Sequence, residues 1–170
     1  MIGLTAIIIA IIAIGYLIIK SLADSKKKEY LARLDISAKD IANCKDGTDL
    51  QKIILQRLYQ KASLIFWRIY NNLLVLFPSA EESAKNGFEL FKNMGEELKT
   101  LDYNAIIDEK QKMEKIFLEI EIPRPETPKQ GEAVLNILND ATELDKLTLM
   151  SIILMGNDKF DIGIKVKVAK

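Results

Sequence analysis

The sequence contains no histidine and only one cysteine, and these absences exclude several kinds of active site. Without histidine there is no Ser-His-Asp triad, no Cys-His pair and no histidine metal site. Cys44 has no second cysteine for a disulfide within the chain, and as a catalytic thiol it would lack a histidine base. The glycines form no phosphate-binding loop. We therefore expect a protein that is not an enzyme, with no cofactor and no catalytic or metal-binding residues.

An excess of positive charge is also missing. The 170 residues include 24 basic and 24 acidic side chains, so the formal net charge is zero. A protein that binds a nucleic-acid backbone usually carries a basic surplus, and one that binds single strands interleaves basic and aromatic residues. Neither pattern occurs here, and we expect no nucleic-acid partner.

What the sequence does have is a long uncharged apolar run from Ile2 to Ile19. As an α-helix this run would be about 27 Å long, close to the thickness of a bilayer core. It predicts a transmembrane anchor over residues 1–20, of the signal-anchor type. The alternative is a cleaved signal peptide, since Ser21-Leu22-Ala23 resembles a cleavage site, but no basic residue precedes the run.

Basic residues follow the run and predict its orientation. By the positive-inside rule the N-terminus would lie outside and the C-terminal domain in the cytoplasm. This predicts a single-pass protein of the cell (inner) membrane, or of a virion membrane, with the lipid bilayer as a partner. The flanking basic residues are Lys20, Lys26, Lys27 and Lys28.

Small residues recur along one face of the predicted span. Such stripes allow close helix packing in lipid, and the stripe predicts a homo-oligomer or a partner membrane protein. The alternative interpretation is that glycine and alanine are simply common in membrane helices. The residues of this predicted packing face are Gly3, Ala6, Ala10 and Ala13.

The rest of the chain is expected to form a juxtamembrane helix or stalk over residues 21–47 and a helical domain over residues 48–170. The central helix is predicted from Leu50 to Phe77, because apolar residues recur on one face and then surround it. We favour a buried core helix, with a membrane-interface segment as the alternative. Arg68 in its middle would then need a partner.

Further helices are predicted on both sides of a linker at 123–130. Ser79 and Glu82 form a capping box for a helix to about Leu101, and another helix begins near Asp102. After the linker an apolar stripe runs from Val134 to Leu154, with a break expected near Asn139-Asp140 and a C-terminal cap at Gly156. Asn157, Asp158 and Asp161 are interpreted as a polar turn rather than a cation site.

Two segments alternate between apolar and polar residues, which predicts strands at 117–122 and 160–168. A lone strand is unstable in water, so each needs a partner. The two predicted strands carry opposite charges, which favours pairing between them. Alternatively, the last strand could join a sheet in another subunit. The candidate strand-pairing residues are Glu119, Glu121, Lys165 and Lys167.

The expected fold class is therefore mainly α, with an N-terminal transmembrane helix followed by a compact helical domain that carries a small two-stranded β element. The expected function is a structural or assembly component of a membrane protein complex, binding through helix faces and the terminal strand. The alternatives are an oligomeric ring-forming membrane pore or channel and, from a different class, a membrane-tethered enzyme that uses carboxylates.

Overall fold

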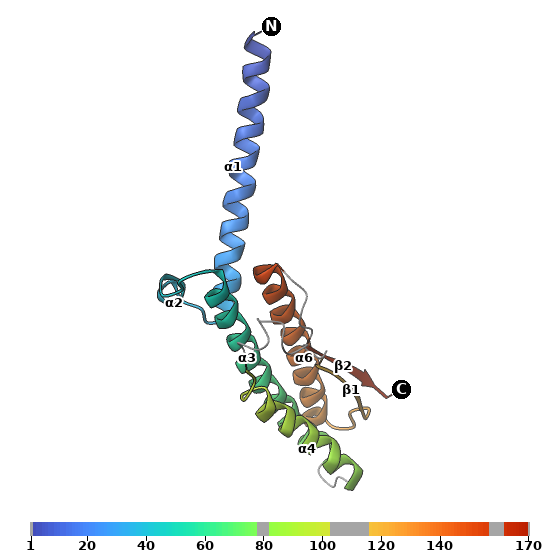
Figure 1. Cartoon of the computed structure of the whole chain (residues 1–170). Helices are drawn as coiled ribbons and strands as arrows, with labels where there is room; N and C mark the ends of the chain where they lie inside the picture. The colour runs from blue at the N-terminus through green and yellow to red at the C-terminus, as the bar shows by residue number, and fades with distance from the viewer. Residues whose placement is uncertain (1, 78–81, 103–115, 157–161, 170) are drawn as a thin grey trace.

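The computed structural model describes residues 2–77, 82–102, 116–156 and 162–169, and it gives side chains for all of these except 2–15, 82–88 and 116–117. Most of the described chain is helical, and the two strands pair with each other (Figure 1). The elements in chain order are α1 (Ile2–Arg33), α2 (Ala38–Ala42), α3 (Gly47–Leu76), α4 (Glu82–Glu97), β1 (Ile116–Ile122), α6 (Pro128–Met155) and β2 (Ile162–Val168).

The first helix does not meet the expectation of a membrane anchor. Among the residues that the structure describes, no helix combines the length and the apolar character that crossing a membrane requires. The second half of α1 is rich in charged side chains, and a segment of this composition is too polar to cross a membrane. This finding contradicts the transmembrane helix in the expected fold class and the single-pass location with an outside N-terminus. The charged residues between Tyr16 and Arg33 are Lys20, Asp24, Lys26, Lys27, Lys28, Glu29 and Arg33.

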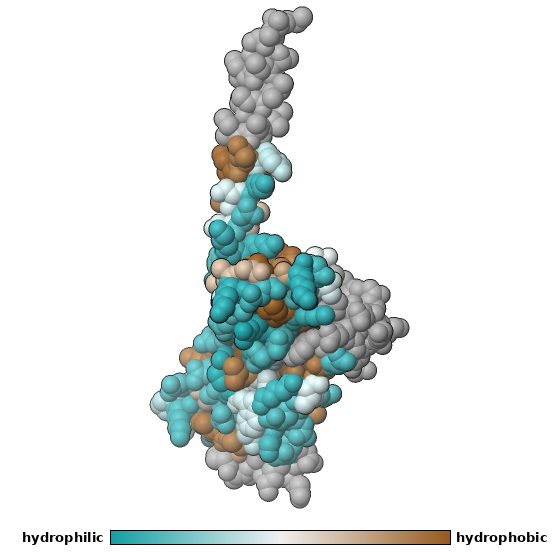
Figure 2. All heavy atoms as spheres, turned by 60° about the vertical axis from the view of Figure 1, so that its left-hand side comes forward, coloured by the Kyte–Doolittle hydropathy of each residue, from teal (hydrophilic) through white to brown (hydrophobic). Residues whose placement is uncertain are grey.

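Helix α1 extends as a rod away from the rest of the molecule, and its C-terminal end packs against α6 (Figure 1). The described part of the rod changes from apolar to hydrophilic side chains toward the body (Figure 2). Tyr16, Leu17, Ile18, Ile19 and Leu22 are each more than half exposed. The packing face predicted at Gly3, Ala6, Ala10 and Ala13 lies outside the described side chains and stays a prediction.

The expected stalk is not one continuous helix. Helix α1 ends at Arg33, and Asp35 adopts a positive φ of 56° that reverses the chain. Leu34 and Ile36 on either side are buried, so the turn is held by the core rather than exposed as a linker. Ser37 and Asp40 then cap the short helix α2 reciprocally.

The core forms where α3 packs against both α4 and α6 (Figure 1). The central helix predicted at 50–77 is confirmed as a core helix, with bounds Gly47–Leu76. Asp46 caps its start by accepting from the backbone N–H groups of Thr48 and Asp49. The buried apolar residues of α3 are Ile54, Leu55, Leu58, Tyr59, Ala62, Ile65, Phe66, Ile69, Leu73 and Leu76.

Helix α6 is continuous where a break was expected near Asn139-Asp140. Thr127 caps its start with Gln130 as the reciprocal partner, and Pro128 occupies the first turn, where its missing N–H is tolerated. Gly156 ends the helix with a left-handed φ of 67°, as predicted. Because the helix is unbroken, a single element packs against α3, β2 and the end of α1.

Several sequence predictions fall outside the described residues. These are the start of the capping box at Ser79, the helix predicted after Asp102, and the polar turn at Asn157, Asp158 and Asp161. The described part of the helix predicted to reach Leu101 ends at Glu97.

We expect Gly95 to be required for the contact between α3 and α4. A Cβ at this position would lie 3.3 Å from Nε1 of Trp67 and 3.6 Å from the carbonyl oxygen of Ser63. Gly95→Leu should therefore lower the free energy of unfolding by about 1–3 kcal/mol, as overpacking generally does. Chemical denaturation with a linear extrapolation measures the change.

The matched control is Gly131→Leu in α6, where an added Cβ meets nothing within 4 Å. Because leucine is a better helix former than glycine, this variant should be unchanged or more stable by up to about 1 kcal/mol. Equal losses in both variants would contradict the close approach at Gly95.

Candidate interaction site

The two strands form a parallel sheet whose connection is α6. Parallel strands need a long crossover, and the chain leaves β1, passes through α6 and returns as β2 (Figure 1). One face of the sheet is apolar and turns inward, with Ile122, Ile162 and Ile164 buried and Leu118 and Ile120 half-buried. The sheet is therefore part of the core on this face.

The opposite face of the sheet is charged and exposed. The register places Glu119 opposite Lys165 and Glu121 opposite Lys167. Oε1 of Glu119 lies 3.5 Å from Nζ of Lys165, and its Oε2 lies 3.4 Å from Nζ of Lys167. The structure thus brings the four candidate strand-pairing residues together within one chain, with Glu119 bridging both lysines.

The two lysines change the ionisation of the glutamate between them. Lys167 and then Lys165 lower the pKa of the Glu119 carboxyl below its ordinary value of 4.5. The cause is the attraction between the carboxylate and the two ammonium groups, reinforced by their hydrogen bonds. The charged face is thus a row of acidic groups on β1 beside a row of basic groups on β2.

Each strand also has an outer edge that no described strand covers. Ala169 donates its N–H to the carbonyl oxygen of Ile122 at 2.9 Å. This bond shows that the backbone groups of Ala169 face β1 and that those of Ile122 face β2. Successive backbone groups of a strand point to alternate sides, so the N–H and C=O groups of Ile164, Val166 and Val168 face outward. Those of Phe117, Glu119 and Glu121 face outward on β1.

The N-terminal end of β2 is held by α6. Thr148 is buried and donates its hydroxyl to the carbonyl oxygen of Ile162 at 3.0 Å. Thus the first outward carbonyl of β2 already has a partner inside the chain. The stretch of edge that remains for another strand is Ile164–Val168.

The helix that carries the sheet is fixed to α3 by an ion-pair cluster. Arg68 donates Nε and Nη2 to Oδ1 of Asp140 at 2.9 and 2.7 Å, and Nη2 also reaches Oε2 of Glu143 at 2.6 Å. Asp140 is only 8% exposed, so its carboxylate depends on this partner. The hydrogen bonds that Arg68 donates to Asp140, and then the negative charges of Asp140 and Glu143, raise the pKa of Arg68.

Sequence reasoning recognised that Arg68 needs a partner but missed Asp140. The missed signal is positional, because Asp140 lies between Ile137 and Leu144 on the buried stripe of α6. A charged residue at such a position requires a buried counter-charge. On the same helix, Asn72 donates to the carbonyl oxygen of Arg68 and accepts from Nδ2 of Asn136.

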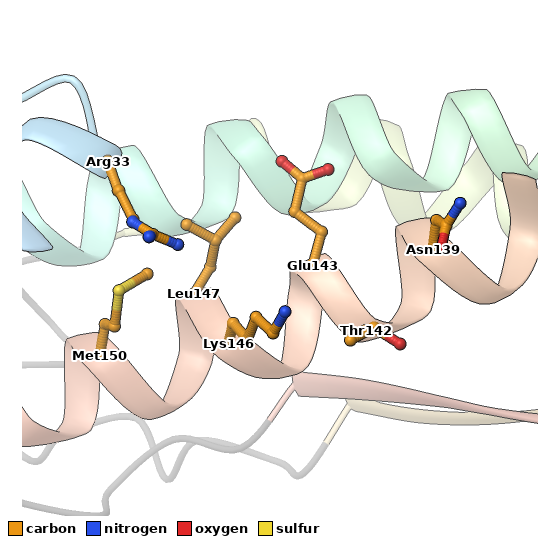
Figure 3. A pocket seen from close by; sticks show the side chains of 7 residues that line it. All are labelled: Arg33, Asn139, Thr142, Glu143, Lys146, Leu147 and Met150. Atoms are coloured by element: carbon orange, nitrogen blue, oxygen red, sulfur yellow. The ribbon is translucent and has the colours of Figure 1, made fainter.

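A surface cleft of about 400 Å³ lies between the end of α1 and α6 (Figure 3). Its floor is apolar, from the buried Leu147 and Met150. Two of the charged groups on its rim have partners in the chain, since Arg33 pairs with Glu29 and Glu143 with Arg68. The remaining lining residues are Asn139, Thr142 and Lys146.

The other predicted residues take no part in a site. Lys20, Lys26, Lys27 and Lys28 are exposed along α1. Cys44 is partly buried and its thiol donates to the carbonyl of Asp40 at 3.3 Å. Within the described ranges, no group of three or more cysteine, aspartate and glutamate side chains is placed to hold a metal ion.

No protein-family model, no curated protein and no solved structure matches this chain.

We predict that the carboxyl of Glu119 titrates below 4.5 because of the two lysines. A group with a depressed folded pKa stabilises the fold above its unfolded pKa, and this stabilisation is lost as the pH falls through the folded value. In Lys165→Gln/Lys167→Gln the midpoint should move back up toward 4.5. Side-chain carboxyl chemical shifts followed by NMR give both midpoints, and identical midpoints would disprove the coupling.

Replacing Arg68 by methionine should destabilise the fold more than replacing Glu143 by glutamine. Arg68→Met leaves the nearly buried carboxylate of Asp140 without its cation, and we expect a loss of about 1–3 kcal/mol. Glu143→Gln removes only a half-exposed ion pair, which is worth about 0–1 kcal/mol. Denaturant unfolding separates the two cases, and a larger loss in Glu143→Gln would refute the role of Asp140.

Proposed function

We propose that this chain is a structural assembly component that binds another polypeptide as an additional strand along the outer edge of β2. The observation that carries the proposal is a parallel sheet of only two strands whose outer edge is uncovered among the described residues. The pore alternative requires a membrane-spanning helix and is not retained.

A short parallel sheet of this kind favours further pairing. Parallel sheets are usually covered on both faces and contain more strands, and a two-stranded unit alone is marginally stable. An edge strand presents N–H and C=O groups that serve as a template for an extended peptide. On β2 these groups belong to Ile164, Val166 and Val168.

The edge is also held rigidly, which reduces the entropy lost on binding. Thr148 ties β2 to α6, and the cluster of Arg68 with Asp140 ties α6 to α3. A strand that binds here would therefore be fixed relative to the helical body. Such geometry suits a component that positions one protein against another.

The enzyme alternative finds less support in the described residues. The cleft beside α6 is open, and the ionisable groups on its rim are exposed, with Arg33 and Glu143 paired within the chain. Catalytic groups are generally converged on a reacting atom and shifted in pKa by burial. No such arrangement supports the cleft as a catalytic centre.

The proposal is tested by blocking the edge without removing the strand. Proline at position 166 removes an outward N–H, and proline is tolerated on edge strands in this orientation. We expect Val166→Pro to remain folded but to lose its place in a larger complex. Val166→Thr keeps the N–H and the β-branched shape and should retain the complex, whereas Lys167→Pro, whose N–H faces β1, should lower the melting temperature.

The measurement is the native mass of the tagged full chain in extracts of the cells that produce it. A mild non-ionic detergent keeps the exposed apolar residues of α1 from aggregating. A complex larger than the 19.2 kDa monomer that is lost in Val166→Pro supports the proposal. A monomer in the extract, or a complex that persists in both Val166→Pro and the more exposed edge variant Val168→Pro, overturns it.

A further inference from the structure

We propose that the strand taken up by the outer edge of β2 is β1 of a second copy of this chain, so that copies join head to tail. This inference rests on the proposed assembly function and names its partner. It commits to one occupant, which is chosen on charge and on hydrogen-bond register.

The charge pattern of β1 complements that of β2, as their pairing within the chain already shows. Glu119 and Glu121 stand opposite Lys165 and Lys167. An incoming β1 in the same parallel register would place a second acidic row on the other side of the same lysines. The exposed face would then alternate between acidic and basic strands, an arrangement in which every neighbouring row attracts.

The hydrogen-bond register of the outer edge fits the same alignment. Val166 directs its N–H and C=O outward, so a parallel partner must oppose it with a residue whose own groups point away. In β1 this condition is met by Leu118, Ile120 and Ile122, whose groups face the β2 of their own chain, and alignment of the charged rows selects Ile120. Ile120 also stands opposite Val166 inside the chain. One register therefore satisfies both the inner and the outer edge.

Symmetric pairing of the two copies is disfavoured by the same charges. Two β2 edges placed side by side would set Lys165 and Lys167 of one copy near the same lysines of the other. Two β1 edges would bring Glu119 and Glu121 together in the same way. Like charges opposite each other destabilise strand pairs. The β1-to-β2 contact is heterologous, and such contacts build rings or open filaments.

The faces of the sheet are compatible with this growth. In the proposed register Ile120 of one copy lies opposite Val166 of the next. Their side chains therefore lie on the same face of the sheet, the face that carries α6 in both copies. These residues are half-buried in the single chain, and Val168 is 41% exposed. Pairing would cover more of their apolar surface.

The test is a charge-swapped chain that carries Glu119→Lys, Glu121→Lys, Lys165→Glu and Lys167→Glu. Within the swapped chain the opposite charges between β1 and β2 are retained, so its melting temperature should stay close to that of the original chain. Between a swapped and an original chain every pair becomes like-charged. We therefore expect the two chains to assemble separately when mixed.

Native mass spectrometry of isotopically labelled original chain mixed with swapped chain, at low salt and after subunit exchange, measures the mixed species. Mixed contacts should be about tenfold rarer than like-with-like contacts. The matched control swaps the exposed pair on α1, Glu29→Arg with Arg33→Glu, and should mix freely with the original chain.

Free mixing of the swapped and original chains would overturn the inference. So would a purified chain that remains monomeric at every concentration. If the cell extract still shows a complex that Val166→Pro abolishes, the occupant is an acidic strand of another protein and the assembly function stands. Should the swapped chain melt lower than the original, Val168→Pro decides the question, because it must reduce the self-assembly of the purified chain.

Discussion

The packing of α6 against α3 is the contact on which the other elements depend. Along this contact leucine and isoleucine side chains from both helices are removed from water, which supplies most of the stabilisation. The ion pair of Arg68 with Asp140 contributes little net stability, because the attraction between the two charges roughly offsets the cost of removing them from water. The pair aligns the two helices at one place along their length. Any element attached to α6 inherits that alignment.

The sheet is one such element. Strand β2 lies against α6 and is attached to it through the hydroxyl of Thr148, and β1 pairs with β2. A parallel pair this small has few ladder hydrogen bonds of its own, so its stability comes from the apolar face that it buries with the helix. This explains why Ile122 and Ile162 are fully buried although the opposite face is charged. The two strands therefore depend on packing against the helix and do not form an independently stable sheet.

The parts of this arrangement that follow a local rule could be predicted from the sequence. The 3.6-residue stripe of α3, the glycine cap at Gly156 and the alternation of both strands each report on a single segment. Opposite charges also predicted that Glu119 and Lys165 belong together. The parallel direction of the pair and the partner of Arg68 depend on how distant segments meet. The sequence contains a signal for only the second of these, because Asp140 is a charged residue on an apolar stripe.

The prediction for α1 failed for a different reason. Hydropathy measures what it costs to leave a segment in water, and it does not identify the surface that covers the segment. Between Lys20 and Arg33 the charges of α1 make exposure inexpensive, and the described part of the rod becomes hydrophilic toward the body (Figure 2). Tyr16 to Ile19 are apolar and exposed in the single chain.

The lysines of β2 show how an exposed edge can be both protected and selective. Lysine on an edge strand normally prevents pairing, because an incoming neutral or basic strand must approach several unsatisfied positive charges. Here the row beside the lysines is acidic, so Glu119 neutralises them on the inner side at the same time as it pairs the strand. On the outer side, in the proposed assembly, the same charges would disfavour a strand that lacks carboxylates at alternate positions. Specificity then arises from repulsion of unsuitable strands as much as from attraction of the right one, and the chain itself contains one strand that satisfies the rule.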